Sequence, residues 1–314
     1  MTWAGMWVAA TAASWGRDMD GRDAFSRCHP LVAFVFFALV LLLTMLVMRP
    51  AFLAISLLGA AAYGAYLRRR RFWRMWRTLL PLLVLTAVVN PLFSHRGVTV
   101  LAYFPSGNPL TLESILYGLA AAALLCCAVL WLACCADVMT TDKFVYLFGR
   151  LAPALSLLLS MTLRFIPQVR RRHRAISDAR DAMGGNGRGG ALRRRMAELG
   201  ILTTWSLEGA VDTADSMRSR GYGLPGRTSF SIYRFRRRDG VLLAVMALCG
   251  AYTAWGCRSQ ALTWSFYPRA QGAPLGAFAL SVYGAYGLLC SLPLLVDLAE
   301  ELRWAAAERR AWNG

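Results

Sequence analysis

Long apolar stretches separated by short polar connections dominate the chain. Six of them approach or exceed the length that a helix needs to cross about 30 Å of hydrocarbon at about 1.5 Å per residue. These stretches are Pro30–Met48, Ala51–Leu67, Leu79–Phe93, Ser114–Ala136, Gly240–Gly256 and Pro274–Leu298. The pattern predicts an all-α integral membrane protein with about six membrane spans.

A long polar region separates the fourth predicted span from the fifth. Its apolar run Leu151–Leu163 would reach only about 20 Å as a helix, so we expect a helix buried at the inner face of the membrane. A basic helix should follow Pro167 and end at Met183, where glycines begin. A second helix should start near Ala191 and stop at Gly221. It has small or apolar residues at helical spacing, namely Leu199, Leu202, Ser206, Ala210, Ala214 and Met217.

The connection between the third and fourth spans has a different pattern. His95–Pro109 contains the β-branched residues Val98, Thr99 and Val100, followed by a turn signal at Pro105–Pro109. This combination is typical of a hairpin. We therefore expect a small hairpin or cap on the outer side, with His95 as a solvated residue rather than a metal ligand.

Arginines set the expected orientation, because cytoplasmic loops carry an excess of positive charge. Between the second and third spans lie Arg68, Arg69, Arg70, Arg71, Arg74 and Arg77. If that connection is cytoplasmic, both termini are cytoplasmic too, and the outer connections hold only Arg49, Arg96, Arg258 and Arg269. We expect a multi-pass protein of the plasma membrane. Its parts are a leader at 1–29, four spans at 30–136, a cytoplasmic coupling-helix region at 137–239, and two spans with a tail at 240–314.

Composition narrows the possible functions. The chain is 57% hydrophobic and 17% charged, and its net charge of +18 favours an anionic membrane face or an acidic protein partner over nucleic acid. Lys143 is the one lysine, and its neighbours are not glycine-rich, so a phosphate-binding loop is excluded. No cofactor or metal is expected. No His or carboxylate joins the cysteines of the fourth span, so we interpret them as packing residues: Cys126, Cys127, Cys134 and Cys135.

Ser219-Arg220-Gly221 places an arginine at a helix end, directly before a glycine that closes it. In one interpretation Arg220 only caps the helix, since a cation favours its negative end by about 0.3–1 kcal/mol. In the other, its guanidinium presents a planar fork of donors to a carboxylate on another protein. Ala210 and Ala214 would let such a helix lie closely in a groove. Other arginines of these helices are expected to be surface charges near the inner leaflet: Arg171, Arg172, Arg193, Arg194 and Arg195.

Two separated motifs carry a family resemblance. The first is Met161–Pro167, which contains Arg164 and Pro167 and precedes a basic helix; the second is Ala214–Gly223, followed by Gly226–Phe230. Together they resemble the transmembrane T component of energy-coupling factor (ECF) transporters. The resemblance covers about 25–239 and includes His29-Pro30, Asn90–Phe93 and Leu110–Glu113.

The resemblance implies a division of labour. Two cytoplasmic ABC-type ATPase subunits hydrolyse ATP, a small membrane S component binds a vitamin or metal ion, and the T component connects them within the lipid bilayer. It also implies two coupling helices that each end in an Ala-Arg-Gly-like motif docked on one ATPase. The second motif is then Ser219, Arg220 and Gly221. The first is Ala182, Met183 and Gly184, where methionine replaces the arginine; Arg180 could supply a cation instead, or an apolar contact could replace it.

We therefore expect a non-enzymatic energy-coupling subunit, and we weigh it against two other classes. A membrane-embedded transferase would need buried carboxylate and histidine clusters, whereas Glu113 reads as a helix-start residue and Asp297 lies beside Glu300 and Glu301 at a membrane exit. A stand-alone carrier would need ionisable residues or a broken helix at mid-membrane, for which Asn90-Pro91 is the one candidate.

Overall fold

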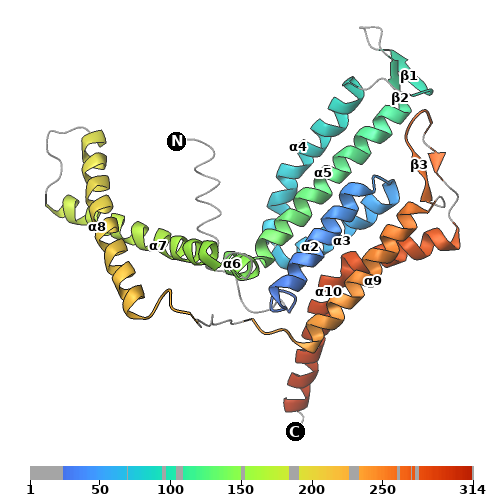
Figure 1. Cartoon of the computed structure of the whole chain (residues 1–314). Helices are drawn as coiled ribbons and strands as arrows, with labels where there is room; N and C mark the ends of the chain where they lie inside the picture. The colour runs from blue at the N-terminus through green and yellow to red at the C-terminus, as the bar shows by residue number, and fades with distance from the viewer. Residues whose placement is uncertain are drawn as a thin grey trace. The chain divides into compact units, whose positions relative to one another are not determined.

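The computed structural model describes residues 24–68, 70–93, 97–103, 109–149, 153–183, 191–225, 233–259, 262–269, 271–272 and 276–312. The leader before Ala24, His95 and Gly184 lie outside the described residues. The chain divides into two compact units, which we describe separately (Figure 1). The membrane unit comprises 1–140 and 235–314, and the coupling unit comprises 141–234.

Every predicted span is a helix of the membrane unit. The helices are α2 (Pro30–Leu46), α3 (Pro50–Arg68), α4 (Arg70–Phe93), α5 (Leu112–Val138), α9 (Arg237–Arg258) and α10 (Ala277–Trp312). Among the described residues, α3, α5, α9 and α10 are long and apolar enough to cross a membrane, and α2 and α4 contain shorter apolar helices. The all-α membrane fold is thus confirmed. Helix α10 is longer than predicted, since it continues beyond Leu298 to Trp312.

Helix α5 packs against α2, α3 and α4, while α10 packs against α3 and α9. Aromatic rings fill the space between them, with edge-to-face pairs at centroid distances of 5.4 Å for Phe25–Phe36, 5.6 Å for Phe36–Trp131 and 6.4 Å for Phe25–Tyr63. Edge-to-face geometry places the positive edge of one ring on the negative face of the next. Phe25, which precedes α2, is therefore part of the core.

A hydroxyl network joins four helices inside this core. The Thr44 hydroxyl lies 2.7 Å from that of Tyr286 and 3.1 Å from that of Ser56, and the Trp131 indole N–H donates to Ser56 over 3.0 Å. All four side chains are buried. Because hydrocarbon offers no hydrogen-bond partners, these bonds fix the relative positions of α2, α3, α5 and α10.

The connections between α4 and α5 and between α9 and α10 each contain a short two-stranded sheet. Strands β1 (Val100–Tyr103) and β2 (Pro109–Thr111) pair antiparallel, as predicted for this connection. The Thr111 hydroxyl then caps α5 by accepting from the Ser114 N–H, and Glu113 accepts from the Thr99 N–H and hydroxyl. A second pair, β3 (Trp264–Ser265) and β4 (Gln271–Gly272), was not predicted because each strand has only two residues.

The coupling unit consists of α6 (Thr141–Gly149), α7 (Pro153–Ala182) and α8 (Ala191–Ser219). Helix α7 continues through Pro167, so the prediction of two helices divided there is wrong. A proline removes one backbone hydrogen bond, and the strong helix formers around it, such as Leu163 and Gln168, allow the helix to continue. The first half of α7 exposes three leucine side chains that the other described parts of the protein do not bury: Leu155, Leu158 and Leu159.

We expect Tyr286→Phe to lower the thermal unfolding midpoint of the purified protein in detergent. The change removes one hydroxyl from the network, which typically costs about 0.6–1.7 kcal/mol inside a membrane protein. Tyr103→Phe, at a position that is 73% exposed, is the matched control and should leave the midpoint unchanged. Equal midpoints for the two variants would show that the network adds no stability.

Candidate functional site: the ends of the coupling helices

Helix α8 ends in a backbone arrangement that only glycine fits without strain. Gly221 has a φ of +78°, its N–H donates to the Arg218 carbonyl over 3.0 Å, and the Tyr222 N–H donates to the Met217 carbonyl over 3.0 Å. This pair of bonds is the Schellman motif, with Gly221 at the left-handed position after the helix. The predicted stop at Gly221 is confirmed, and two terminal carbonyls of the helix have backbone partners.

Arg220 lies at this helix end with its side chain exposed. Its N–H donates to the Ser216 carbonyl over 3.3 Å, and the Ser219 hydroxyl donates to the same carbonyl over 3.0 Å. Within the described part of the chain the Arg220 guanidinium has no ion-pair partner. Backbone and hydroxyl donors thus cap the helix end, and the Arg220 side chain is exposed beside them.

The face of α8 leading to this end is only partly covered. Leu202 is buried, and the Ser206 hydroxyl donates to its carbonyl over 2.7 Å. Further along, Ala210 and Ala214 are exposed. Leu199, at the start of the same face, is also 53% exposed, so the predicted face is covered only around Leu202 and Ser206.

The first motif has a different chemistry. Helix α7 ends at Ala182, and Met183 follows in a turn with 78% of its surface exposed. Arg180 is only half-buried, but it has an interaction of its own. Gly184 lies outside the described residues. At the end of α7, the accessible side chain is thus an apolar thioether.

Side chains missed by the sequence analysis hold α7 and α8 together. Phe165 stacks on Trp205 with a centroid distance of 6.2 Å and an interplanar angle of 5°. The Arg172 guanidinium carbon lies 5.1 Å from the centroid of the same Trp205 ring, a cation–π contact. Arg172 is exposed as expected for a surface charge, but it also joins the two helices.

A second contact between these helices is polar. His173 Nε2 lies 3.6 Å from Glu198 Oε2, and Glu198 is only 5% exposed. Arg164 and Pro167, which belong to the first motif, are exposed on α7. In sequence they lie close to Phe165, one of the residues through which α7 contacts α8. The contacts fix the start of α8 on the middle of α7 and leave both helix ends, at Met183 and Arg220, clear of the crossing.

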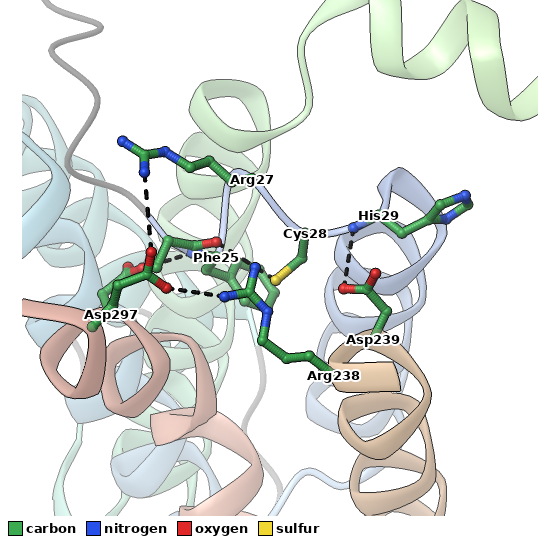
Figure 2. Close-up of polar contacts among 9 residues, drawn as sticks. Phe25, Arg27, Cys28, His29, Arg238, Asp239 and Asp297 are labelled. Carbon is green, nitrogen blue, oxygen red and sulfur yellow. Dashed lines mark hydrogen bonds and ion pairs between the residues drawn. The ribbon is translucent and has the colours of Figure 1, made fainter. Parts of the chain in front are cut away.

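The sequence analysis also missed a polar cluster at the start of α9, which we name the polar junction. It consists of Arg27, Cys28, His29, Arg238, Asp239, Asp297 and Glu300. Figure 2 shows Asp239 and Asp297 directed at backbone N–H groups of the segment before α2. Asp239 accepts from the N–H of Arg236 over 2.9 Å and of His29 over 3.5 Å. Asp297 accepts from the Phe25 N–H over 2.7 Å. Sequence spacing gave no signal for the bonds to His29 and Phe25, because each joins residues more than 200 positions apart.

The described residues contain no group of three or more His, Cys, Asp or Glu side chains that could hold a metal ion. The paired cysteines of α5 are free thiols, and three of them are fully buried. A helical membrane unit with two long polar helices inserted in sequence between α5 and α9 defines a class of protein: a helical membrane protein that carries a separate polar helical unit.

Comparison with known proteins identifies the family. The family described as "Cobalt transport protein" (CbiQ) matches residues 22–230, and the chain belongs to it. The chain is 27% identical over 256 residues to the energy-coupling factor transporter transmembrane protein EcfT of Brevibacillus brevis, covering 76% of this chain and 96% of that protein. It is 26% identical over 253 residues to EcfT of Bacillus selenitireducens, covering 75% and 94%.

A third relative has a different name. The chain is 29% identical over 223 residues to a putative ABC transporter ATP-binding protein of Bifidobacterium longum, covering 67% of this chain and 28% of that protein. With the two EcfT relatives, this match identifies the chain as the transmembrane T component of an ECF transporter. The family is one of transporter components rather than enzymes, and the resemblance found in the sequence is confirmed.

We expect Gly221→Ala to loosen the end of α8. A side chain in the left-handed conformation costs about 1–2 kcal/mol, so hydrogen exchange of the last-turn amides should accelerate about 5- to 30-fold. Gly200→Ala is the matched control, because Gly200 lies inside the same helix with no atom within 4 Å of an added Cβ. It should slow exchange instead, since alanine favours helices. Unchanged exchange in Gly221→Ala would contradict this account of the helix end.

Proposed function

We propose that this chain transmits the opening and closing of two ABC-type ATPase subunits to a small membrane S component, driving uptake of a vitamin or metal ion. The observation that carries the proposal is the exposed end of α8, where the Arg220 guanidinium has no ion-pair partner among the described residues and Gly221 fixes the backbone. The family's description as a cobalt transport protein supports a metal ion as cargo. The relative named as an ATP-binding protein supports an ATPase partner.

The proposed orientation places both termini in the cytoplasm. It rests on the arginines of the 68–77 connection and on their scarcity in the outer connections. The same reasoning places 137–239 in the cytoplasm between the four spans of 30–136 and the two spans of 240–314, with the leader 1–29 on the same side. The protein then spans the plasma membrane with its coupling helices facing the ATPases.

The two docking motifs contribute different chemistry. Arg220 offers a bidentate contact to an ATPase carboxylate, Ser219 and Gly221 fix the backbone that carries it, and Ala210 and Ala214 allow close approach. At the end of α7, Ala182, Met183 and Gly184 offer an apolar contact, because Met183 is exposed and Arg180 is engaged. Unequal motifs would let two different ATPases be distinguished.

The S component has a candidate surface of its own. The first half of α7 exposes large apolar residues: Leu155, Leu158, Leu159, Met161, Phe165 and Ile166. Exposed apolar patches of this kind mark contacts with protein or membrane. We propose that the S component covers this surface where the coupling unit meets the inner leaflet.

The purified chain alone should hydrolyse no ATP. It has no phosphate-binding loop, and phosphoryl transfer depends on positioned phosphate and magnesium contacts that such a loop supplies. Phosphate release should equal that of a protein-free detergent blank. Release that persists after removal of every co-purifying ATPase would contradict the proposal that hydrolysis belongs to partner subunits.

Arg220→Ala should weaken association with the ATPases, because removing one partner of a desolvated charge pair costs about 2–5 kcal/mol. Arg220→Lys should have a smaller effect, since it keeps the charge but loses the fork geometry. Arg218→Ala is the matched control: Arg218 is an exposed arginine of the same last turn, so its removal changes the helix-end charge equally. Co-purification with the ATPases and uptake in vesicles are measured together.

If Arg220 only caps its helix, Arg220→Lys and Arg218→Ala should match the parent in both measurements, and Arg220→Ala should differ from it no more than Arg218→Ala does. Normal membrane insertion of every variant, checked by its yield from membranes, ensures that a loss reflects docking. If the Arg220 variants differ from the parent no more than Arg218→Ala does, Arg220 serves only as a helix cap.

A further inference from the structure

The polar junction holds the first turn of α9 to the segment before α2 and to α10, all within the membrane unit. Helix α8 ends at Ser219 and α9 begins at Arg237, so one of the two chain connections between the units enters the membrane unit just before α9; the other lies between α5 and α6. Asp239 lies in that turn. Its carboxylate accepts from the N–H of Arg236, which closes the helix start, and from the N–H of His29, which precedes α2.

Helix α10 joins the junction through two acidic side chains. Arg238 Nη1 lies 3.0 Å from Glu300 Oε2, and Arg27 Nη1 lies 4.0 Å from Glu300 Oε1. Asp297, one turn earlier, accepts the Phe25 N–H and is completely buried. The segment before α2 is therefore bonded to both α9 and α10.

The aromatic core extends this connection further into the unit. The Phe25 ring lies 5.4 Å from Phe36 of α2 and 6.4 Å from Tyr63 of α3. A displacement of the first turn of α9 would therefore act on α2, α3 and α10 together. Close packing allows little of such a displacement to be absorbed locally.

The burial of the carboxylates separates this junction from ordinary surface ion pairs. Asp239 is 2% exposed and Asp297 is 0% exposed. Buried carboxylates are costly unless hydrogen bonds satisfy them, so their bonds persist only in one arrangement. The Arg238–Glu300 pair is partly exposed and adds less. The two buried carboxylates, Asp239 and Asp297, therefore form the rigid part of the junction.

Cys28 lies inside the junction, so the reactivity of its thiol shows whether the junction is intact. Figure 2 shows its thiol beside Arg238, and its residue is 1% exposed. Burial raises the pKa of this thiol from 9.0 to about 11, and Asp239, Asp297 and Glu300 add to the rise while Arg238 opposes it. In the closed junction Cys28 should therefore resist alkylation even near pH 9.

We propose that the polar junction is the anchor through which movement of α8 reaches the membrane helices, with Asp239 and Glu300 as positioning residues for coupling. The inference rests on the proposed coupling function. A loosened anchor would let the ATPases bind and hydrolyse ATP while the membrane helices no longer follow. The predicted signature is a lower number of cargo molecules taken up for each ATP hydrolysed.

The test uses the complete complex, with its ATPases and S component, reconstituted in liposomes. Asp239→Ala and Glu300→Gln should retain ATPase co-purification and keep ATP hydrolysis within about twofold. Uptake per ATP should fall about five- to tenfold in Asp239→Ala and by less in Glu300→Gln, because the Arg238–Glu300 pair is partly exposed. Cys28, followed by mass spectrometry of its peptide, should become alkylated in Asp239→Ala. Tyr286→Phe is the stability-matched control outside the junction, and Glu308→Gln is the control for loss of an exposed carboxylate on α10.

A second variant tests the path without altering the junction. Six Gly/Ser residues inserted between Pro225 and Gly226 add slack to the connection, since such linkers are flexible coils. The insertion should lower uptake per ATP while Cys28 stays protected. This variant also keeps the test informative if Asp239→Ala fails to fold.

Three results would overturn the inference: unchanged uptake per ATP in Asp239→Ala, unchanged uptake per ATP in the insertion variant, or an equal fall in Tyr286→Phe. The last would show that the junction acts only through stability. A parent complex that binds no ATPase or shows no ATP-dependent uptake would instead refute the proposed function, so the two failures are distinguishable.

Discussion

The inability of hydrocarbon to hydrogen-bond the backbone is the constraint on which this structure depends. It requires each apolar stretch to satisfy its own N–H and C=O groups as a helix, and it requires interior hydroxyls to pair with one another. Thr44, Ser56 and Tyr286 do so across three helices, and Trp131 joins them from a fourth. The charged groups that remain collect where the helices leave the apolar region, as Asp239, Asp297 and Glu300 do.

The same constraint explains why the coupling unit needs its own means of assembly. Its helices carry too many arginines to be held by lipid, so specific contacts position α8 on α7. The stacking of Phe165 on Trp205, the Arg172 guanidinium over that ring and the His173–Glu198 pair serve this purpose. Since these contacts lie in the middle of α7 and the first half of α8, the motif-bearing ends are accessible to other proteins.

Sequence periodicity predicted the helices well because hydrophobic length is a local property. The stop at Gly221 was likewise visible, since a left-handed residue after a helix favours glycine. Continuation of α7 through Pro167 was not, because the penalty of one proline is outweighed by its neighbours. The polar junction could not be predicted at all: nothing near Asp239 in the sequence indicates that His29 lies beside it. The roles of Arg220 and Met183 come from the resemblance and remain proposals.

Coupling demands opposite mechanical properties at the two ends of the path from α8 to the membrane helices. At the proposed docking end, Arg220 is exposed, and among the described residues its guanidinium has no ion-pair partner. At the membrane end, Asp239 and Asp297 are buried, so moving either from its N–H donors would strand a charge at a cost of several kcal/mol. Force applied at Arg220 is therefore better relieved by moving whole helices than by opening the junction. The contrast in burial is thus the physical reason to assign docking to one end and anchoring to the other.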